Sequence, residues 1–225
     1  MTPTLQILRA GPQMTVQDLG RPALTARGLA TGGAADRTAL AEAAALLNLT
    51  HFPAAIEIAG MGGEFAVTLP TRIALTGAPM RAKVDAKEIG WNQTHLILPG
   101  QRLSIGGALS GVYGYLATAG GIATEPVLGS RSTHLVGNIG QILAAGDGLI
   151  LGPDPTPTAP TVRITPEPRF SGGAVRMMPG PQTGLFEKAE LARFLASEFA
   201  RGAASNRQGV RLEHGGAPFQ AGEAA

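Results

Sequence analysis

The chain has no cysteine, few charged or aromatic residues and no long apolar run. Without cysteine, disulfide scaffolds, cysteine-ligated zinc, iron–sulfur clusters and thiol nucleophiles are all excluded. No window approaches the roughly 18 uninterrupted apolar residues of a membrane-spanning helix, and no basic stretch followed by an apolar run opens the chain. We therefore expect a cytoplasmic protein with no membrane partner.

Charge is scarce and balanced. The sequence has 18 Lys and Arg against 16 Asp and Glu, and charged residues make up 15% of the chain. No basic face or tail points to nucleic acid. By contrast, 32 glycines and 17 prolines among 225 residues are nearly double the usual share. Such frequent interruption excludes helical bundles and coiled coils, and it favours many short elements.

Short apolar runs closed by glycine or proline fill the first 152 residues, a pattern typical of antiparallel β-sheets. Period-two alternation is clearest at Phe65, Val67 and Leu69. One Ala- and Leu-rich stretch instead predicts a helix over about residues 36–48, with Asp36 as its N-cap. The expected strands span residues 5–9, 55–59, 64–69, 72–76, 94–98, 102–105, 112–118 and 149–151.

A proline-rich stretch over residues 153–168 can form neither a central strand nor a helix. It predicts a linker between a first domain at residues 1–152 and a second region at residues 169–225. In that second region, residues 175–178 predict a strand. An apolar stripe from Leu185 to Phe199 predicts a helix closed by Arg201 and Gly202.

Local signatures of nucleotide, metal and serine-hydrolase sites are missing. The sequence contains no G-x-x-x-x-G-K-[ST], H-E-x-x-H or G-x-S-x-G motif, and its four histidines are far apart and unpatterned. What remains are glycine-rich segments that each carry one or two polar side chains.

The first such segment contains Asp18 and Arg21, three residues apart beside a glycine. A buried pair of this kind would form an ion pair, and the arginine fork could also orient a carboxylate or amide ligand. A purely structural turn explains the same residues. Similarly, the glycines before Asp36 could receive an anion at a helix start, or Asp36 could simply cap the helix.

A second segment, residues 129–133, places Ser130, Arg131, Ser132 and Thr133 directly after Gly129. Such a loop can bind a carboxylate or phosphate, or can stabilise an oxyanion. Two further segments have weaker patterns that a β-turn and a solvated loop also explain. They are Thr76, Gly77 and Ala78 at a strand end, and residues 205–211, which include Arg207.

A series of motifs in fixed order resembles the biotin-dependent carboxyltransferase and allophanate hydrolase subunit 2 family, which includes the C subunit of 5-oxoprolinase. The motifs are T-V-Q-D-L-G-R-P at residues 15–22, G-A-A-D at 33–36, A-x-E at 55–57, L-T-G-A at 75–78, Y-L-A-T-A-G-G-I at 115–122, V-L-G-S-R-S-T at 127–133 and G-D-x-L at 146–149. The resemblance covers about residues 5–151 and continues less densely beyond them.

The resemblance implies a mainly β fold of two cyclophilin-like β-barrel halves, the second of them incomplete. It also implies partners, namely the A-like and B-like subunits of a 5-oxoprolinase. Together they would open 5-oxoproline to glutamate with hydrolysis of ATP, and this chain would be inactive alone. ATP would be shared with the partner subunits, and biotin would enter only on a separate carrier protein.

Within that resemblance, we expect a polar pocket for a small carboxylate-bearing substrate or its phosphorylated intermediate. Asp18, Arg21 and Arg131 would position and stabilise charge in catalysis. Two other functions stay open: a biotin-dependent carboxyltransferase or allophanate hydrolase-related subunit, and a non-catalytic module that antagonises a kinase-inhibitor partner. The expected substrate-binding residues are Thr76, Gly77, Ala78, Gly129, Ser130, Ser132, Thr133 and Arg207.

The sequence departs from the family pattern at three positions and at its C-terminal end. Gly33, Asn206 and Gln208 stand where the family usually has serine, aspartate and methionine, and the chain ends at Ala225. Family members run on for roughly a further hundred residues. We therefore expect a fragment or truncated product with a less stable C-terminal region, whose apolar surface over residues 175–199 lacks a complete lid.

Overall fold

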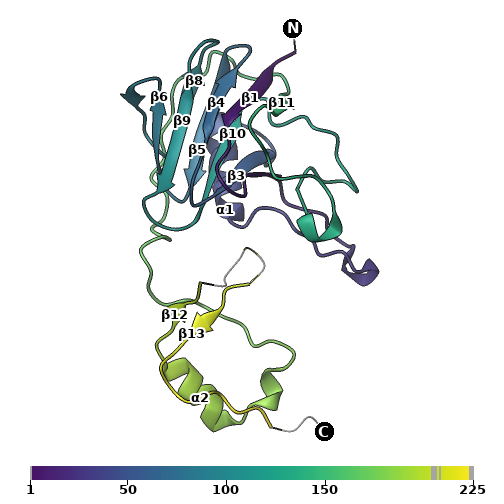
Figure 1. Cartoon of the computed structure of the whole chain (residues 1–225), viewed down its shortest axis with the longest axis vertical. Coiled ribbons are helices and arrows are strands. Elements are labelled where there is room, and N and C mark those ends of the chain that lie inside the picture. Colours follow the sequence, from purple (N-terminus) through teal and green to yellow (C-terminus); the bar gives the residue numbers. More distant parts are fainter. Residues whose placement is uncertain (1, 204–206, 208, 223–225) are drawn as a thin grey trace. The chain divides into compact units, whose positions relative to one another are not determined.

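Antiparallel strands form most of the regular secondary structure of the first structural unit, Met1–Gly172 (Figure 1). The computed structural model describes residues 2–203, 207 and 209–222. The strands of this unit are β1 (Thr4–Arg9), β2 (Thr15–Gln17), β3 (Ala55–Ala59), β4 (Glu64–Val67), β5 (Thr71–Gly77), β6 (Met80–Val84), β7 (Lys87–Glu88), β8 (Gln93–Ile97), β9 (Leu103–Ala108), β10 (Tyr113–Thr118) and β11 (Gly148–Ile150). They form a six-stranded sheet, ordered β11-β1-β4-β9-β6-β7, and a five-stranded sheet, ordered β2-β3-β10-β5-β8. The predicted mainly β class is confirmed.

The main core lies between the two sheets and draws apolar side chains from both. Phe65 of β4 and Ile105 of β9 meet Ile56 and Ile58 of β3 in one buried cluster. Because successive side chains of a strand point to opposite faces, Ala55 of β3 faces away from this cluster, toward a second one. Each large side chain buried here stabilises the fold by about 1.5–3 kcal/mol relative to its exposed state.

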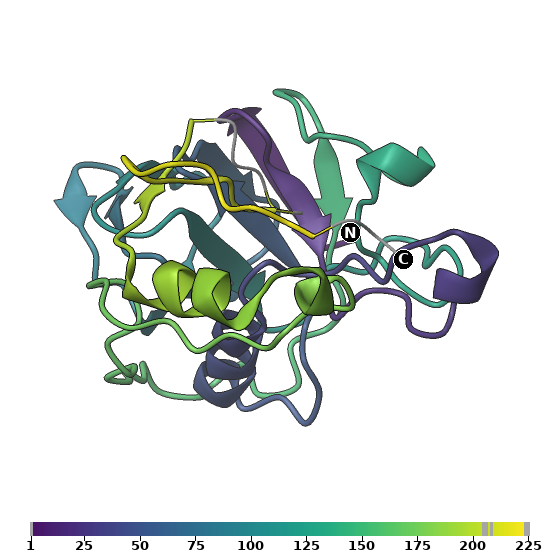
Figure 2. The same ribbon diagram turned by 90° about the horizontal axis from the view of Figure 1, so that it is seen from below.

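A single helix, α1 (Arg37–Leu47), covers the other face of the five-stranded sheet (Figure 1, Figure 2). Small side chains on that face, such as Ala74 and Ala117, allow the helix to approach closely. The Asp36 carboxylate accepts a hydrogen bond from the Ala39 N–H at 3.1 Å, which satisfies one of the free donors at the helix start. The predicted helix and its cap are confirmed.

All eight strands predicted for residues 1–152 are present in the first unit. Three further strands of this unit, β2, β6 and β7, were missed. β2 and β7 are too short to show a sequence period. β6 does alternate, since Met80 and Ala82 are buried while Arg81 and Lys83 are exposed, but its charged residues and the nearby glycine and proline concealed it. β2 and β7 are short strands at sheet edges, whereas β6 lies inside its sheet between β9 and β7.

The proline-rich residues 153–168 lie along the first unit, which continues to Gly172 and does not end at residue 152. Val162 pairs with Thr94 of edge strand β8 through two hydrogen bonds, at 2.8 and 2.9 Å. Arg72, only 5% exposed, holds the Asp154 carboxylate with two hydrogen bonds, at 2.8 and 2.9 Å. Proline removes donors only at its own positions, so the residues between the prolines still attach this segment.

The second unit, Gly173–Ala225, has little internal packing. Its elements are the 3₁₀ turn η3 (Thr183–Leu185), α2 (Lys188–Ala196), β12 (Ala200–Arg201) and β13 (Leu212–Glu213). Phe194, Phe199, His214 and Phe219 stack with ring centroids 4.6–6.2 Å apart, yet none of these side chains is buried. Among its described residues, only Gly202 is buried. A unit without a buried apolar core has little to offset its conformational entropy.

Two predictions for this unit are wrong. Residues 175–178 form no strand, and Val175 and Met178 are 86% and 88% exposed, so no neighbouring strand is there to pair with them. The predicted helix is shorter than its apolar stripe, because Leu185 belongs to η3 and Phe199 follows the last turn of α2. Over the part of the chain that the structure describes, no helix combines the length and apolar character needed to cross a bilayer.

We predict that the two units differ sharply in stability. In the full chain, amide hydrogens of residues 2–172 in the sheets and α1 should exchange slowly, whereas those of residues 173–222 should exchange within seconds, because almost none of that unit is buried. Hydrogen–deuterium exchange by mass spectrometry measures this difference. A chain cut after Gly172 should keep its melting temperature within about 3 °C of the full chain. Equal protection of both units would contradict the prediction.

Candidate functional site

Two segments that lie far apart in the sequence meet at the end of β2. The backbone N–H of Thr133 donates to the Val16 carbonyl at 2.9 Å. The buried Gln17 side chain donates to the Thr15 hydroxyl at 3.0 Å and to the Thr133 carbonyl at 3.1 Å. These contacts fix residues 127–133, which have no sheet of their own, onto the five-stranded sheet.

Asp18 organises this loop with both of its carboxylate oxygens. Oδ1 accepts hydrogen bonds from the hydroxyls of Ser130 and Ser132 at 2.5 Å and from the Gly20 N–H at 2.8 Å, and Oδ2 accepts from the Arg131 N–H at 2.6 Å. Burial alone would raise the pKa of the Asp18 carboxyl. The two hydroxyls and two backbone N–H groups outweigh that effect and hold the pKa below its ordinary value.

Arg21 holds the same loop from its other side. Its side chain is 1% exposed and donates to three main-chain carbonyls: Nε to Val127 at 2.9 Å, and Nη2 to Ser130 at 3.2 Å and to Ser132 at 2.5 Å. The predicted ion pair with Asp18 is absent, and Nη1 is buried without a hydrogen-bond partner in the described structure. The Ser132 carbonyl has no other donor among the described residues, so its hydrogen bond helps to hold the guanidinium against the loop.

Arg131 differs from Arg21 in its environment. It is half-buried, and its Nε donates to the Thr124 carbonyl at 2.7 Å. Among the described residues, no acceptor pairs with either terminal nitrogen. A guanidinium held in place by one edge, with its other donors free, is suited to a carboxylate or phosphate oxygen.

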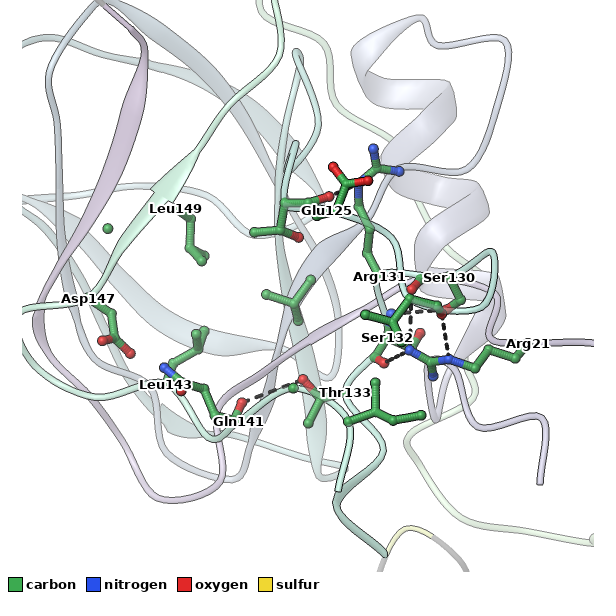
Figure 3. Close-up of a pocket in the computed structure, with 16 residues that line it drawn as sticks. Arg21, Glu125, Ser130, Arg131, Ser132, Thr133, Gln141, Leu143, Asp147 and Leu149 are labelled. Carbon is green, nitrogen blue, oxygen red and sulfur yellow. Dashed lines mark hydrogen bonds between the residues drawn. The ribbon is translucent and has the colours of Figure 1, made fainter. Parts of the chain in front are cut away.

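Arg131 forms part of the wall of a cavity of about 320 Å³ (Figure 3). This volume suits a small metabolite. The acidic side chains of Glu125 and Asp147 also border the cavity, and apolar side chains complete its wall. The lining residues are Val16, Arg21, Thr124, Glu125, Val127, Ser130, Arg131, Ser132, Thr133, Ile139, Gly140, Gln141, Leu143, Asp147, Gly148 and Leu149.

The other predicted site residues lie elsewhere. Thr76 and Ala78 are fully buried, and the Thr76 hydroxyl donates to the Ala39 carbonyl of α1 at 2.9 Å. Gly77 has φ +74° and its carbonyl accepts from the Trp91 indole at 3.1 Å. Gly129 is exposed at a turn next to the cavity.

The C-terminal candidates are not part of this cavity as described. Arg207 is exposed in the second unit. Ser205, Asn206 and Gln208 lie outside the described residues.

A row of polar side chains beneath α1 was not predicted. Thr15, Glu57, Tyr115 and Thr76 lie directly opposite one another on four adjacent strands. The Tyr115 hydroxyl donates to the Glu57 carboxylate at 2.8 Å and accepts from the Asp36 N–H at 2.7 Å. Burial and the Glu57 charge raise the pKa of the Tyr115 phenol, so it stays protonated.

This row fixes the chain entering α1, because the Glu57 carboxylate also accepts from the Ala35 N–H at 2.8 Å. Tyr115 looked like a packing residue in the sequence, since only strand register shows which side chains face each other. Glu125, Gln141 and Asp147 lie outside the strands, and they were missed in the cavity because the sequence does not show which loops pack together. No group of three potential metal-ligating side chains occurs among the residues described.

Comparison with known proteins places these features in context. The family model "Carboxyltransferase domain, subdomain A and B" matches residues 27–224. Over 217 residues the chain is 35% identical to the C subunit of 5-oxoprolinase from Escherichia coli (strain K12), covering 93% of this chain and 68% of that protein. It is 28% identical over 226 residues to urea amidolyase of Saccharomyces cerevisiae, covering 92% of this chain and 12% of that one.

Among solved structures, the crystal structure of TTHA0988 superimposes on the whole chain with a TM-score of 0.89 and 31% identity. The matched part is 44% of that solved chain, so the present chain spans less than half of it.

We predict that Asp18→Asn lowers the free energy of unfolding by about 1–2 kcal/mol at neutral pH, because an amide cannot accept all four hydrogen bonds and the site is only half-buried. The Asp18 pKa is lower in the folded than in the unfolded protein. Its contribution is therefore complete above about pH 4 and is lost as the pH falls through the folded pKa. Urea unfolding at pH 7 and pH 3 should show that the difference in free energy of unfolding between the unaltered chain and the Asp18→Asn variant is smaller at pH 3.

The exposed Asp85, which accepts one hydrogen bond from the Arg102 N–H, provides the matched control Asp85→Asn. At pH 7 it should lower the free energy of unfolding by less than Asp18→Asn does. A loss at Asp18 that is the same at both pH values would contradict the assigned hydrogen bonds.

A second prediction concerns Tyr115→Phe. Removal of the hydroxyl leaves the Asp36 N–H without its acceptor and takes a donor from Glu57, at a cost of about 1–3 kcal/mol. The melting temperature should fall by about 3–9 °C, measured by circular dichroism. An unchanged melting temperature would show that the row beneath α1 does not contribute to stability.

Proposed function

The chain belongs to the carboxyltransferase-domain family, subdomains A and B, and from that membership we propose that it is a subunit of an ATP-dependent enzyme of the 5-oxoprolinase type. The reaction would convert 5-oxoproline, ATP and water to glutamate, ADP and phosphate. The observation that carries this proposal is the Arg131 guanidinium, which is held by its Nε in the wall of a small cavity while its terminal nitrogens have no partner among the described residues. 5-Oxoproline offers one carboxylate to such a group.

In this proposal Arg131 binds the substrate carboxylate and orients the lactam. The hydroxyls of Ser130 and Ser132 both donate to Asp18. Because the pKa of Asp18 is lowered, its carboxylate is a weak base and is poorly suited to activate either hydroxyl as a nucleophile. Asp18 and Arg21 then act as positioning residues that hold the loop, without touching the substrate. Catalysis by this chain would come from orientation and charge stabilisation.

We assign nucleotide binding mainly to partner subunits. ATP carries several negative charges, whereas the cavity offers one free guanidinium and also bears the acidic Glu125 and Asp147. The sequence has no G-x-x-x-x-G-K-[ST] phosphate-loop motif. The cavity thus fits a small monocarboxylate better than a triphosphate. We propose that A-like and B-like subunits complete the enzyme and that this chain alone has no activity.

The similarity to urea amidolyase supports a second candidate, carboxyl transfer to a small amide. That reaction requires biotin on a lysine of a carrier domain. Here the sequence has only Lys83, Lys87 and Lys188, without an A-M-K-M-type site, so a separate protein would have to carry the biotin. Avidin separates the two candidates, because only carboxyl transfer should be inhibited by it.

We predict that Arg131→Ala, in enzyme reconstituted with the A-like and B-like subunits of the same organism, lowers kcat/KM for ATP-dependent glutamate release from 5-oxoproline by about 100-fold. Arg131→Lys should restore part of this loss, because it keeps the charge but not the fork. Arg81→Ala, which removes an exposed arginine of β6, serves as the control and should leave the rate unchanged. Undiminished glutamate release by the Arg131→Ala enzyme would refute the proposed role.

A further inference from the structure

An acidic residue adjoins the anchor of Arg131 in the cavity wall. The Arg131 Nε donates to the Thr124 carbonyl at 2.7 Å, so the next residue, Glu125, begins at the same peptide unit that holds the guanidinium. Both charged side chains border the cavity (Figure 3). They form no ion pair with each other, and Glu125 has no hydrogen-bond or ion-pair partner among the described residues. The wall therefore presents an unpaired cation and an unpaired anion.

The backbone around Glu125 is held in place. Two residues earlier, the Ala123 N–H donates to the carbonyl of Ile150 in β11 at 2.8 Å. Glu125 also precedes Pro126, and a following proline disfavours the helical backbone conformation. Only the rotations of the Glu125 side chain then have to be ordered when a ligand binds, which limits the entropy cost of the contact.

Asp147, the other acidic residue at the cavity, has a structural role. Its Oδ2 accepts a hydrogen bond from the Ala144 N–H at 2.8 Å, and its own N–H donates to the Ala144 carbonyl at 3.2 Å. These two contacts close a turn just before β11. Figure 3 shows Asp147 well separated from Arg131. The turn accounts for Asp147, whereas no contact within the described part of the chain accounts for Glu125.

A carboxylate close to the guanidinium makes the site selective. Glu125 repels a ligand that offers negative charge alone, but it accepts a hydrogen bond from an N–H donor. A ligand satisfies both residues when its carboxylate reaches Arg131 and an N–H group on the adjoining carbon reaches Glu125. The charges of the wall therefore favour carboxylates that carry nitrogen on their α-carbon.

We propose that Glu125 is a specificity-determining residue, which accepts a hydrogen bond from nitrogen on the α-carbon of the carboxylate that Arg131 binds. The inference rests on the proposed function for the identity of the ligand. In 5-oxoproline the lactam N–H stands at that position. When the ring opens, the C–N bond breaks, the oxygen of water joins the carbonyl carbon, and both protons of water go to the nitrogen. The resulting ammonium group of glutamate keeps the contact with Glu125 and adds a positive charge to it.

The test compares two rings that differ only at this nitrogen. Cyclopentanone-3-carboxylate keeps the carboxylate and the ring carbonyl of 5-oxoproline but has a methylene in place of the N–H. In an NMR chemical-shift titration, the full chain should bind 5-oxoproline about fivefold more tightly than the ketone. Glu125→Ala should abolish this preference, so that the two Kd values agree within about twofold. Because Glu125 is exposed, its removal should leave the melting temperature unchanged.

A second variant separates charge from hydrogen bonding. Glu125→Gln keeps an oxygen acceptor but loses the negative charge. It should weaken binding of L-glutamate, which carries the ammonium group, by about fivefold, and binding of 5-oxoproline by only about twofold. The control is Glu88→Ala, because Glu88 is an exposed residue of β7 and does not line the cavity. It should leave all three affinities unchanged.

The outcomes distinguish this inference from the proposed function. Equal affinity of the unaltered chain for the two rings, or a preference that survives in Glu125→Ala, overturns the role of Glu125 and leaves the proposed function intact. A preference that depends on Glu125, in a chain whose assembled enzyme releases no glutamate from 5-oxoproline, supports the inference and overturns the proposed function. Absence of 5-oxoproline binding by the chain, both alone and assembled with the A-like and B-like subunits, overturns both.

Discussion

The hydrogen bonds that Asp18 and Arg21 make to residues 127–133 are the interaction on which the candidate site depends. The chain between β10 and β11 contains no strand of either main sheet, so its order has to come from outside contacts. Asp18 supplies acceptors for hydroxyls and N–H groups, and Arg21 supplies donors for carbonyls. Both kinds of backbone group are therefore satisfied within a few residues, which is the condition for burying an irregular loop.

The different roles of Asp18 as an acceptor and Arg21 as a donor also explain why these two residues form no ion pair. If the Arg21 guanidinium paired with Asp18, the Ser132 carbonyl would lose its donor, and the serine hydroxyls would compete with the guanidinium for the same carboxylate. Buried unsatisfied carbonyls and hydroxyls cost more than an ion pair returns. The spacing of Asp18 and Arg21 suggested a pair, but a spacing argument cannot include a loop that approaches from more than a hundred residues away.

Other outcomes follow the same division between local and long-range information. The cap at Asp36 and the alternation around Phe65 depend on neighbouring residues, and the sequence predicted both. The polar residues that follow Gly129 already indicated Ser130 and Arg131 as candidates, but only the family resemblance grouped them with Asp18 in one pocket. Glu57 and Tyr115 lie opposite each other because of the register between β3 and β10, which the sequence of either strand alone does not reveal. Thr76 was a candidate for substrate binding, but the structure directs its hydroxyl to the Ala39 carbonyl of α1.

The two charged groups that hold the loop nearly cancel, which leaves Arg131 as the cation able to act on a ligand. A free guanidinium exposed to water attracts a carboxylate weakly, because the solvent screens the pair. The half-buried position of Arg131 already removes part of that screening, and its contact with the Thr124 carbonyl limits its motion. What the first unit does not supply is cover over the cavity rim. Displacement of water from that rim by a bound ligand would strengthen the attraction between Arg131 and a carboxylate.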